Sequence, residues 1–174
     1  MFLTLASLAF AGTLAGVTLP DTAQVGGAPV VLNGMGLREK YFLDIYVCGL
    51  YLPSKTADAK QAIEVDAPKR IVMRFIYSKV TREQMVETFM EGFGDKATGA
   101  MKPSIDKLLA VVPAQVVSGD ELTFEYVPGT GTTMSLKGKP LVTIPGSEFM
   151  KMVWGIYLGP KPPTEALKTG LLGK

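Results

Sequence analysis

The chain has 174 residues, 47% of them hydrophobic and 20% charged, which predicts one compact domain that folds without a disulfide or a metal ion. Its 18 Lys and Arg residues against 16 Asp and Glu leave a formal net charge of +2, too small to predict a nucleic-acid partner. The absence of histidine and the single cysteine, Cys48, exclude His-dependent triads, His-containing zinc sites and CxxC motifs, so we expect neither a metal ion nor a cofactor.

The first 15 residues carry no charge and end in small residues, with an Ala-x-Ala sequence at Ala9–Ala11 and a second possible cleavage point after Ala15. This pattern is typical of a secretory signal peptide, although no Lys or Arg precedes the apolar run. The alternative is a buried N-terminal strand or helix, since the run is shorter than the ~20 residues of a membrane span. We expect a signal peptide at 1–15, a domain at 16–174, and a periplasmic or secreted protein without stable membrane insertion.

The first half of the domain predicts strands followed by helices. Apolar runs at Val30–Asn33 and Phe42–Leu52 indicate strands, and the glycine-containing segment 33–36 indicates a turn between them. Thr56–Ile63 predicts a short surface helix. A strand follows at 69–77, and its apolar face is formed by every second residue, namely Ile71, Met73, Phe75 and Tyr77.

A helix is predicted at Thr81–Phe93. Thr81 and Gln84 have the spacing of a capping box, and apolar side chains recur every four residues at Met85, Phe89 and Phe93. The acidic row formed by Glu83, Glu87 and Glu91 is interpreted as a solvated helix face.

In the second half, a helix precedes a group of strands and two helices follow them. Further helices are predicted at Pro103–Val112, Ser147–Leu158 (capped by Ser147) and Thr164–Leu171, and strands at Leu122–Val127, Thr132–Leu136 and Leu141–Ile144. This order predicts an α+β fold with one antiparallel sheet and helices packed on one face.

Unusual polar side chains on the apolar strands are the candidate functional residues. They are Arg38, Tyr46, Tyr51, Arg70 and Arg74. The planar fork of an Arg can hold a carboxylate or phenolate, and a Tyr hydroxyl adds a directional hydrogen bond. For Arg70 and Arg74 the favoured interpretation is that the side chain reaches solvent, whereas for Arg38 both interpretations stay open.

Three segments resemble the bacterial chalcone isomerase-like proteins. They are LNGMGLREKYFLDIYVCGLYLP, PKRIVMRFIYSKVTREQMVETFMEGF and LTFEYVPGTGTTMSLKGKPLVTIPGSEFMKMVWGIYLGPKPP, so the resemblance covers roughly 17–163. It implies an open-faced β-sandwich, in which a large antiparallel sheet is covered by a layer of helices and ligands lie in a cleft between the two. The family includes enzymes that cyclise chalcones to flavanones, fatty-acid binders and non-catalytic relatives.

The resemblance also assigns candidate site residues. Arg38 matches the Arg that positions the phenolate in the enzymes. The other catalytic positions hold unmatched residue types, namely Tyr46, Gln84, Glu91 and Ile156. The fatty-acid binders pair an Arg with a Tyr, and Arg38 with Tyr46 could reproduce this pair. In an unbroken strand these two would lie about 26 Å apart, so Tyr51 is kept as a reserve partner.

The leading expectation is therefore an exported protein that binds a small apolar anionic ligand, such as a fatty acid, through Arg38, Tyr46 and Tyr51. The first alternative is an intramolecular lyase of the chalcone isomerase type, an isomerase in which Arg38 is catalytic. The second is a non-catalytic scaffold.

Overall fold

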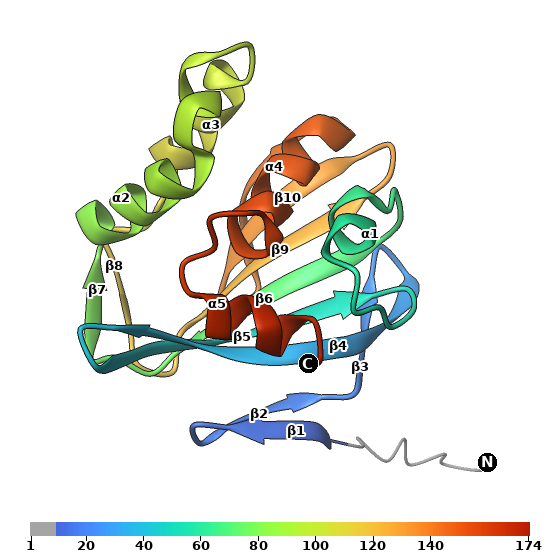
Figure 1. The fold of residues 1–174 in the computed structure, drawn as a ribbon. Helices are drawn as coiled ribbons and strands as arrows, with labels where there is room; N and C mark the ends of the chain where they lie inside the picture. Colours follow the sequence, from blue (N-terminus) through green and yellow to red (C-terminus); the bar gives the residue numbers. More distant parts are fainter. Residues whose placement is uncertain (1–9) are drawn as a thin grey trace, which may run out of the picture.

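A seven-stranded antiparallel sheet organises the computed structural model, which describes residues 10–174 (Figure 1). The strand order is β11-β10-β9-β6-β5-β4-β3. The strands, in chain order, are β3 (Thr22–Val25), β4 (Ala28–Lys40), β5 (Leu43–Leu52), β6 (Lys69–Phe75), β9 (Glu121–Val127), β10 (Gly131–Leu136) and β11 (Lys139–Ile144). Two small two-stranded sheets stand apart from this sheet. One is the hairpin of β1 (Phe10–Leu14) and β2 (Val17–Pro20), and the other pairs β7 (Lys79–Thr81) with β8 (Gln115–Val117), which follows much later in the chain.

The helices gather on one side of the sheet, and the β1–β2 hairpin lies on the other (Figure 1). They are α1 (Ala59–Glu64), α2 (Arg82–Phe93), α3 (Lys102–Ala110), α4 (Ser147–Leu158) and α5 (Glu165–Leu171), with a 3-10 turn at Gly94–Thr98. In residues 10–174 no helix has the length and apolar character needed to cross a membrane. The α+β, open-faced arrangement expected from the sequence is confirmed.

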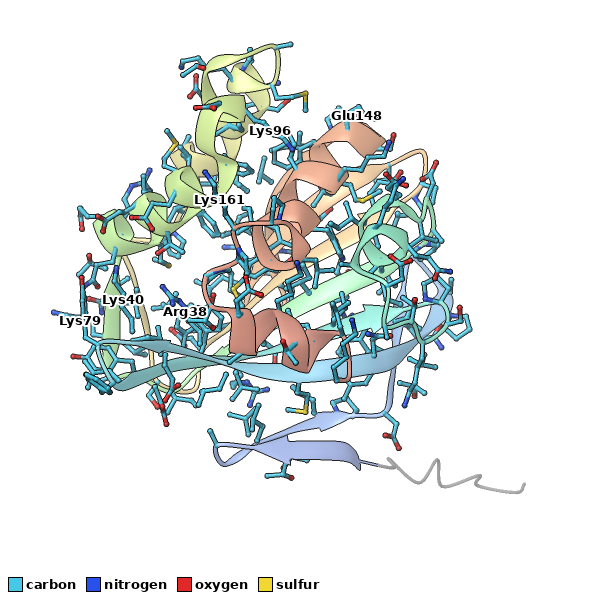
Figure 2. The ribbon with its side chains drawn as sticks, in the orientation of Figure 1. Arg38, Lys40, Lys79, Lys96, Glu148 and Lys161 are labelled. Carbon is cyan, nitrogen blue, oxygen red and sulfur yellow. The ribbon has the colours of Figure 1, made fainter. Side chains whose placement is uncertain are left out.

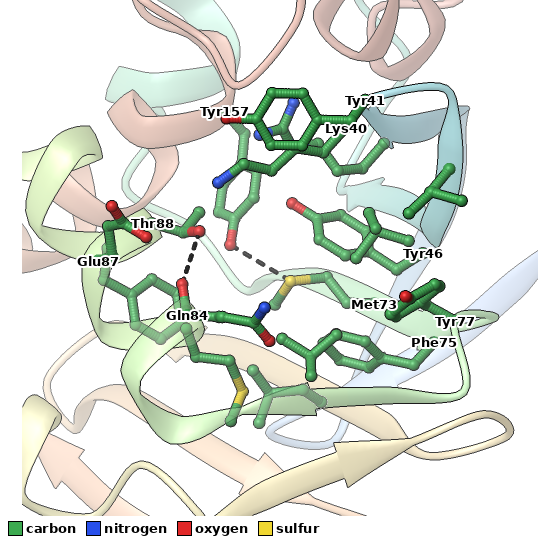
Figure 3. A pocket seen from close by; sticks show the side chains of 17 residues that line it. Lys40, Tyr41, Tyr46, Met73, Phe75, Tyr77, Gln84, Glu87, Thr88 and Tyr157 are labelled. Carbon is green, nitrogen blue, oxygen red and sulfur yellow. Dashed lines mark hydrogen bonds between the residues drawn. The ribbon is translucent and has the colours of Figure 1, made fainter.

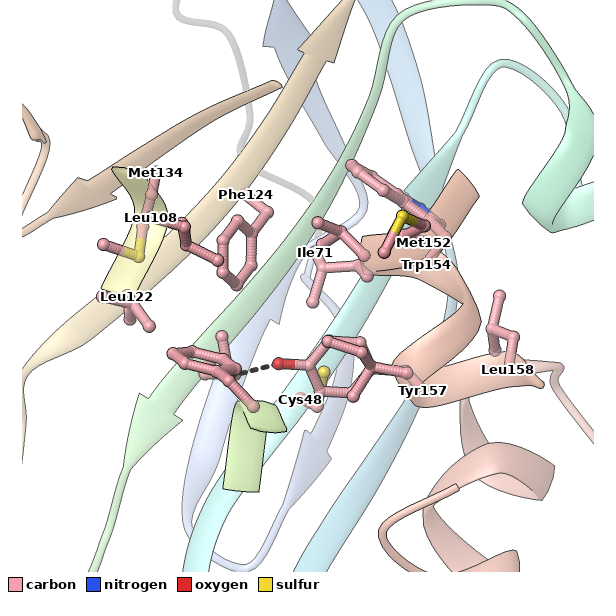
Figure 4. Packing of buried hydrophobic residues seen from close by; sticks show 14 of the residues in the cluster. Cys48, Ile71, Leu108, Leu122, Phe124, Met134, Met152, Trp154, Tyr157 and Leu158 are labelled. Carbon is pink, nitrogen blue, oxygen red and sulfur yellow. Dashed lines mark hydrogen bonds between the residues drawn. The ribbon is translucent and has the colours of Figure 1, made fainter. Parts of the chain in front are cut away.

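Alternation along the central strands assigns each side chain to a face. Ile71, Met73 and Phe75 point into the helix-covered core, as the pattern predicted. Trp154 and Tyr157 of α4 pack onto the same side, as Figure 4 shows. The opposite face carries a smaller apolar cluster that includes residues of β2 and β3, formed by Leu19, Val25, Val30, Leu32, Tyr51 and Val72.

The expected turn at 33–36 is wrong, because β4 runs straight through this segment to Lys40. Gly34 and Gly36 are needed there for close packing: a Cβ on either would collide with a backbone oxygen of α5, that of Gly170 or Leu167. Asn33 marks a bulge in the ladder, and its side-chain amide donates to the Leu171 oxygen at 2.8 Å. These glycines therefore allow α5 to pack closely against β4, and they do not form a turn.

The chain reverses instead at Tyr41 and Phe42. Both residues have left-handed backbone angles, with φ of 52° and 64°, and Lys40 pairs directly with Leu43 across the turn. Such two-residue turns favour Asn and Gly. The aromatic pair gave no turn signal, so the second strand was expected to begin one residue early.

The prediction for α2 is confirmed. The Gln84 amide donates to the Thr81 hydroxyl and the Thr81 amide to the Gln84 side chain, which completes the capping box. Its apolar row is buried and its acidic row is exposed. The strand expected at Val30–Asn33 is too short, because β4 continues for seven residues beyond Asn33, and the other predicted elements agree to within three residues at each end. One cap differs, because Ser147 is the first residue of α4 and Gly146 precedes it with no side-chain cap.

The expected strands did not include β2, β3, β7 or β8, which are short. The strand β1 falls in the N-terminal segment for which a buried strand or helix was the alternative to a signal peptide. Of the expected signal peptide, residues 1–9 lie outside the described residues. Phe10–Leu14 pair with β2 in a hairpin.

Phe89 should make a large contribution to stability. Its side chain is 4% exposed and its ring lies edge-on to that of Phe124, with centroids 5.8 Å apart. Phe89→Ala should therefore lower the free energy of unfolding by about 3–5 kcal/mol, measured by urea titration. The exposed Glu91→Ala on the same helix should change it by less than ~0.5 kcal/mol. A loss of under ~1 kcal/mol for Phe89→Ala would contradict this packing.

Lys69 is a buried cation that is held without a carboxylate partner among the described residues. Its side chain is fully buried, and Nζ donates to the carbonyl oxygens of Ala62 and Ile63 in the last turn of α1, at 3.0 and 2.8 Å. The Trp154 ring centroid lies 5.0 Å from Nζ. Burial lowers the pKa of Lys69 to about 7, and Asp66 opposes this shift.

This shift predicts a pH dependence of folding. The folded-state pKa of about 7 lies below the unfolded value of 10.5, so between them the unfolded chain binds more protons and stability rises with pH. The free energy of unfolding should increase by up to about 1.4 kcal/mol per pH unit from about pH 7 to 8.5. Above this window, ionisation of the unfolded Cys48 thiol opposes the trend, because burial raises the folded pKa of this thiol.

Urea titrations across this window test the assignment. Lys69→Met should flatten the pH slope, whereas Met at the exposed Lys60 of α1 should preserve it. An unchanged slope in Lys69→Met would show that another group titrates.

Candidate functional site

A cavity of about 380 Å³ lies between the sheet and α2 (Figure 3), within the range of about 300–1,000 Å³ that is usual for small-molecule sites. Its inner wall is mostly apolar. The residues of this wall are Tyr46 on β5, Met73 and Phe75 on β6, Leu122 on β9, Met85 and Phe89 on α2, and Tyr157 on α4. Gln84 and Thr88 of α2 add the few polar groups beside it.

The mouth of the cavity is formed by the end of the β4–β5 hairpin. Arg38 and Lys40 lie two residues apart on β4 and both line the cavity, and Tyr41 and Leu43 complete this edge. Neither cation forms an ion pair with a carboxylate of the described residues. Glu87 on α2 is the one acidic residue that lines this cavity.

Arg38 and Tyr46 are direct partners across the β4–β5 ladder. The expected separation of the two residues assumed a straight strand, but the turn at Tyr41 and Phe42 folds the second residue back beside the first. Both side chains line the same cavity. The structure thus unites the Arg and Tyr that the resemblance suggested as a pair.

The Arg38 guanidinium is held by only one of its nitrogens. Nη1 donates to the carbonyl oxygens of Glu39 and Pro163, at 2.8 and 2.9 Å. Among the described residues, nothing accepts a hydrogen bond from Nε or Nη2. These two nitrogens form the side of the guanidinium that binds a carboxylate through two parallel hydrogen bonds.

Tyr46 and Tyr157 are neutral hydrogen-bond donors in the cavity. Burial raises the pKa of Tyr46 well above its usual value, and the nearby Arg38 charge only partly opposes this. Tyr46 Oη has no hydrogen-bond partner in residues 10–174, whereas Tyr157 Oη donates to Met73 Sδ at 3.3 Å. The Tyr46 hydroxyl is therefore available to a ligand.

Tyr51 does not join this site. It lies on the opposite face of the sheet, where its hydroxyl donates to the Pro20 oxygen at 2.8 Å. Five residues separate it from Tyr46, and an odd separation along a strand reverses the face, so the sequence already contained this signal. Arg70 and Arg74 lie on that face too, where they form ion pairs with Glu125 and Glu121.

The cavity residues that the sequence analysis did not identify include Lys40 and Tyr157. Lys40 has the same strand parity as Arg38, which would have identified it, but Tyr157 reaches the cavity only through the packing of α4. Of the positions that correspond to the plant catalytic set, Gln84 lines the cavity, whereas Glu91 is exposed and Ile156 packs against Gly92. In residues 10–174 no three His, Cys, Asp or Glu side chains gather as a metal site would require.

Comparison with known proteins supports this description of the fold. The sequence model of the chalcone isomerase-like family matches residues 11–173. Among solved structures, a fatty-acid binding protein of Arabidopsis thaliana is similar with a TM-score of 0.71 and 15% sequence identity, over 90% of this chain and 92% of that chain. No curated protein sequence matches this one. With nearly its whole length matched, the chain belongs to the chalcone isomerase-like family.

Proposed function

We propose that this protein binds a small apolar carboxylic acid, of the fatty-acid class, in the cavity between the sheet and α2. The observation that carries the proposal is the Arg38 guanidinium, which keeps two donors free at an apolar cavity and lacks a carboxylate partner in the described residues. The similar Arabidopsis structure is that of a fatty-acid binding protein, which supports the same ligand class.

The chemistry of the site suits a carboxylate head group. A half-buried guanidinium without a counter-charge is costly, and a ligand carboxylate would supply that charge. Its two oxygens can accept from Nε and Nη2 of Arg38, and the Tyr46 hydroxyl can donate a third hydrogen bond. Lys40 adds a second positive charge at the same edge.

The wall beyond the head group suits an apolar tail. Met73, Phe75 and Phe89 offer apolar surface, and methionine adapts to tails of different shape. Binding is favoured over chalcone cyclisation because the positions of Glu91 and Ile156 contribute nothing to the cavity.

Substitution of Arg38 should weaken ligand binding in a graded way. Arg38→Lys keeps the charge and loses the fork, so calorimetry with palmitate should give about tenfold weaker binding, and Arg38→Ala about 100-fold weaker binding. Tyr46→Phe removes one neutral hydrogen bond and should cost about three- to tenfold.

Arg74→Ala is the matched control, because Arg74 lies on the opposite face and should leave affinity unchanged. Equal affinity for palmitate in the unmodified protein and in all Arg38 variants would show that Arg38 does not bind the carboxylate. Loss of chalcone absorbance on mixing with the protein, abolished in Arg38→Ala, would instead favour the isomerase alternative.

We also propose that the protein is exported, on the evidence of the uncharged, apolar N-terminal segment. Cleavage after Ala11 would retain most of β1, which pairs with β2, whereas cleavage after Ala15 would remove it. Mass analysis of protein purified from the cell envelope should therefore find a chain that begins between Gly12 and Val17, with Gly12 preferred. A mature chain that retains Met1 would show that no signal peptide is cleaved.

A further inference from the structure

The tip of the β4–β5 hairpin exposes a concentrated apolar surface. Tyr41 is 83% exposed, Phe42 is fully exposed and Leu43 is 45% exposed. In residues 10–174 the one other exposed large hydrophobic side chain is Met90, at 40%. Single exposed apolar residues are normal, but three in succession at a protruding turn indicate contact with something outside the chain.

The conformation of the turn strengthens this argument. Tyr41 and Phe42 both adopt left-handed backbone angles, which are unfavourable for bulky side chains and favourable for Asn and Gly. The exposed Phe42 ring gains no compensating burial within the described chain. Phe42 therefore has an unfavourable backbone conformation that burial does not offset, which indicates that its side chain contacts something outside the chain.

The tip adjoins the cavity mouth. Tyr41 and Leu43 line the cavity, as do the cations Arg38 and Lys40, whereas Phe42 does not. Figure 2 places Arg38, Lys40 and the exposed Lys79 of β7 at the same end of the molecule as the turn.

The acidic residues of the hairpin, unlike its cations, do not line the cavity. Glu39 alternates with the cavity-lining Arg38 and Lys40, so it lies on the other face of the hairpin. Asp44 pairs with Glu39 beyond a bulge in the ladder and shares that face, and neither carboxylate lines the cavity. Glu87, on α2, is the acidic residue that remains on the cavity side. The cavity side of the tip is therefore positively charged.

We propose that this tip docks on the surface of a lipid bilayer that contains anionic lipids, and that the cavity exchanges its ligand there. Aromatic rings flanked by Lys are typical of the membrane interface, and the cations complement anionic headgroups. A two-residue turn is too narrow to bury the roughly 800 Å² per partner of a standard protein interface. The exchange step rests on the proposed function, whereas the docking step does not.

Co-sedimentation of the intact protein with vesicles of phosphatidylcholine and phosphatidylglycerol, at roughly 3:1, tests the docking. Phe42→Asn should reduce the bound fraction at least about fivefold, and Phe42→Trp should preserve or increase it. Met90→Ser controls for general loss of exposed apolar surface and should sediment like the unmodified protein. Because Asn suits a left-handed angle, the urea midpoint of Phe42→Asn should be equal or higher.

A second measurement tests the exchange. Transfer of a fluorescent fatty acid from the protein to these vesicles should accelerate with vesicle concentration, and Phe42→Asn should remove this acceleration. The affinity of the Phe42→Asn variant for palmitate in solution should be unchanged, since Phe42 does not line the cavity.

The outcomes separate the two proposals. Equal sedimentation of Phe42→Asn and unmodified protein would overturn the docking while leaving palmitate binding intact. A dimer that Phe42→Asn converts to a monomer would also overturn it, because the tip would then contact a second copy. Failure of the unmodified protein to bind palmitate would refute the proposed function, and the sedimentation series would still decide the docking.

Discussion

The register between β4 and β5 is the constraint on which the rest of this molecule depends. It is held at one end by the two-residue turn at Tyr41 and Phe42, and along β4 by the glycines that let α5 lie against the strand. A slip of one residue would move every side chain of the shifted strand to the opposite face. Arg38 would then point away from the cavity if β4 shifted, and the buried apolar side chains of β5 would point away from the core if β5 shifted.

The cationic side chains of β4 and β6 have three different environments. Arg70 and Arg74 form ion pairs on the open face, at little net gain or cost. Lys69 is fully buried, which lowers its pKa, and its ammonium group is satisfied by two carbonyl oxygens and an aromatic ring. Arg38 is oriented by two carbonyl oxygens but keeps its remaining donors free, which is the arrangement expected of a binding group rather than a structural one.

The cavity and the turn share residues, so ligand capture and access to the cavity are physically linked. The strand that carries Arg38 continues through Lys40 into the exposed tip, and the tip contributes Tyr41 and Leu43 to the mouth. An apolar ligand with an anionic head group would meet aromatic and cationic side chains before it reached the apolar wall. The β4–β5 hairpin thus contributes both to the charged edge of the cavity, through Arg38 and Lys40, and to its inner wall, through Tyr46.

The sequence by itself determined the fold class, the inward face of β6 and the capping box and buried row of α2, because period-two and near-3.6 patterns and caps are local signals. Family resemblance added Arg38 and Tyr46 as candidates. Only the tertiary structure decided that Gly34 and Gly36 serve helix packing rather than a turn, since glycine permits both and the contacting atoms lie more than 130 residues away. It also decided where the hairpin reverses, because the aromatic pair at 41–42 opposes the usual turn preference and is held by the strand pairing on either side. For the same reason the pairing of Arg38 with Tyr46 could not be read from their spacing: it is set by the turn and the ladder, which are properties of the folded chain.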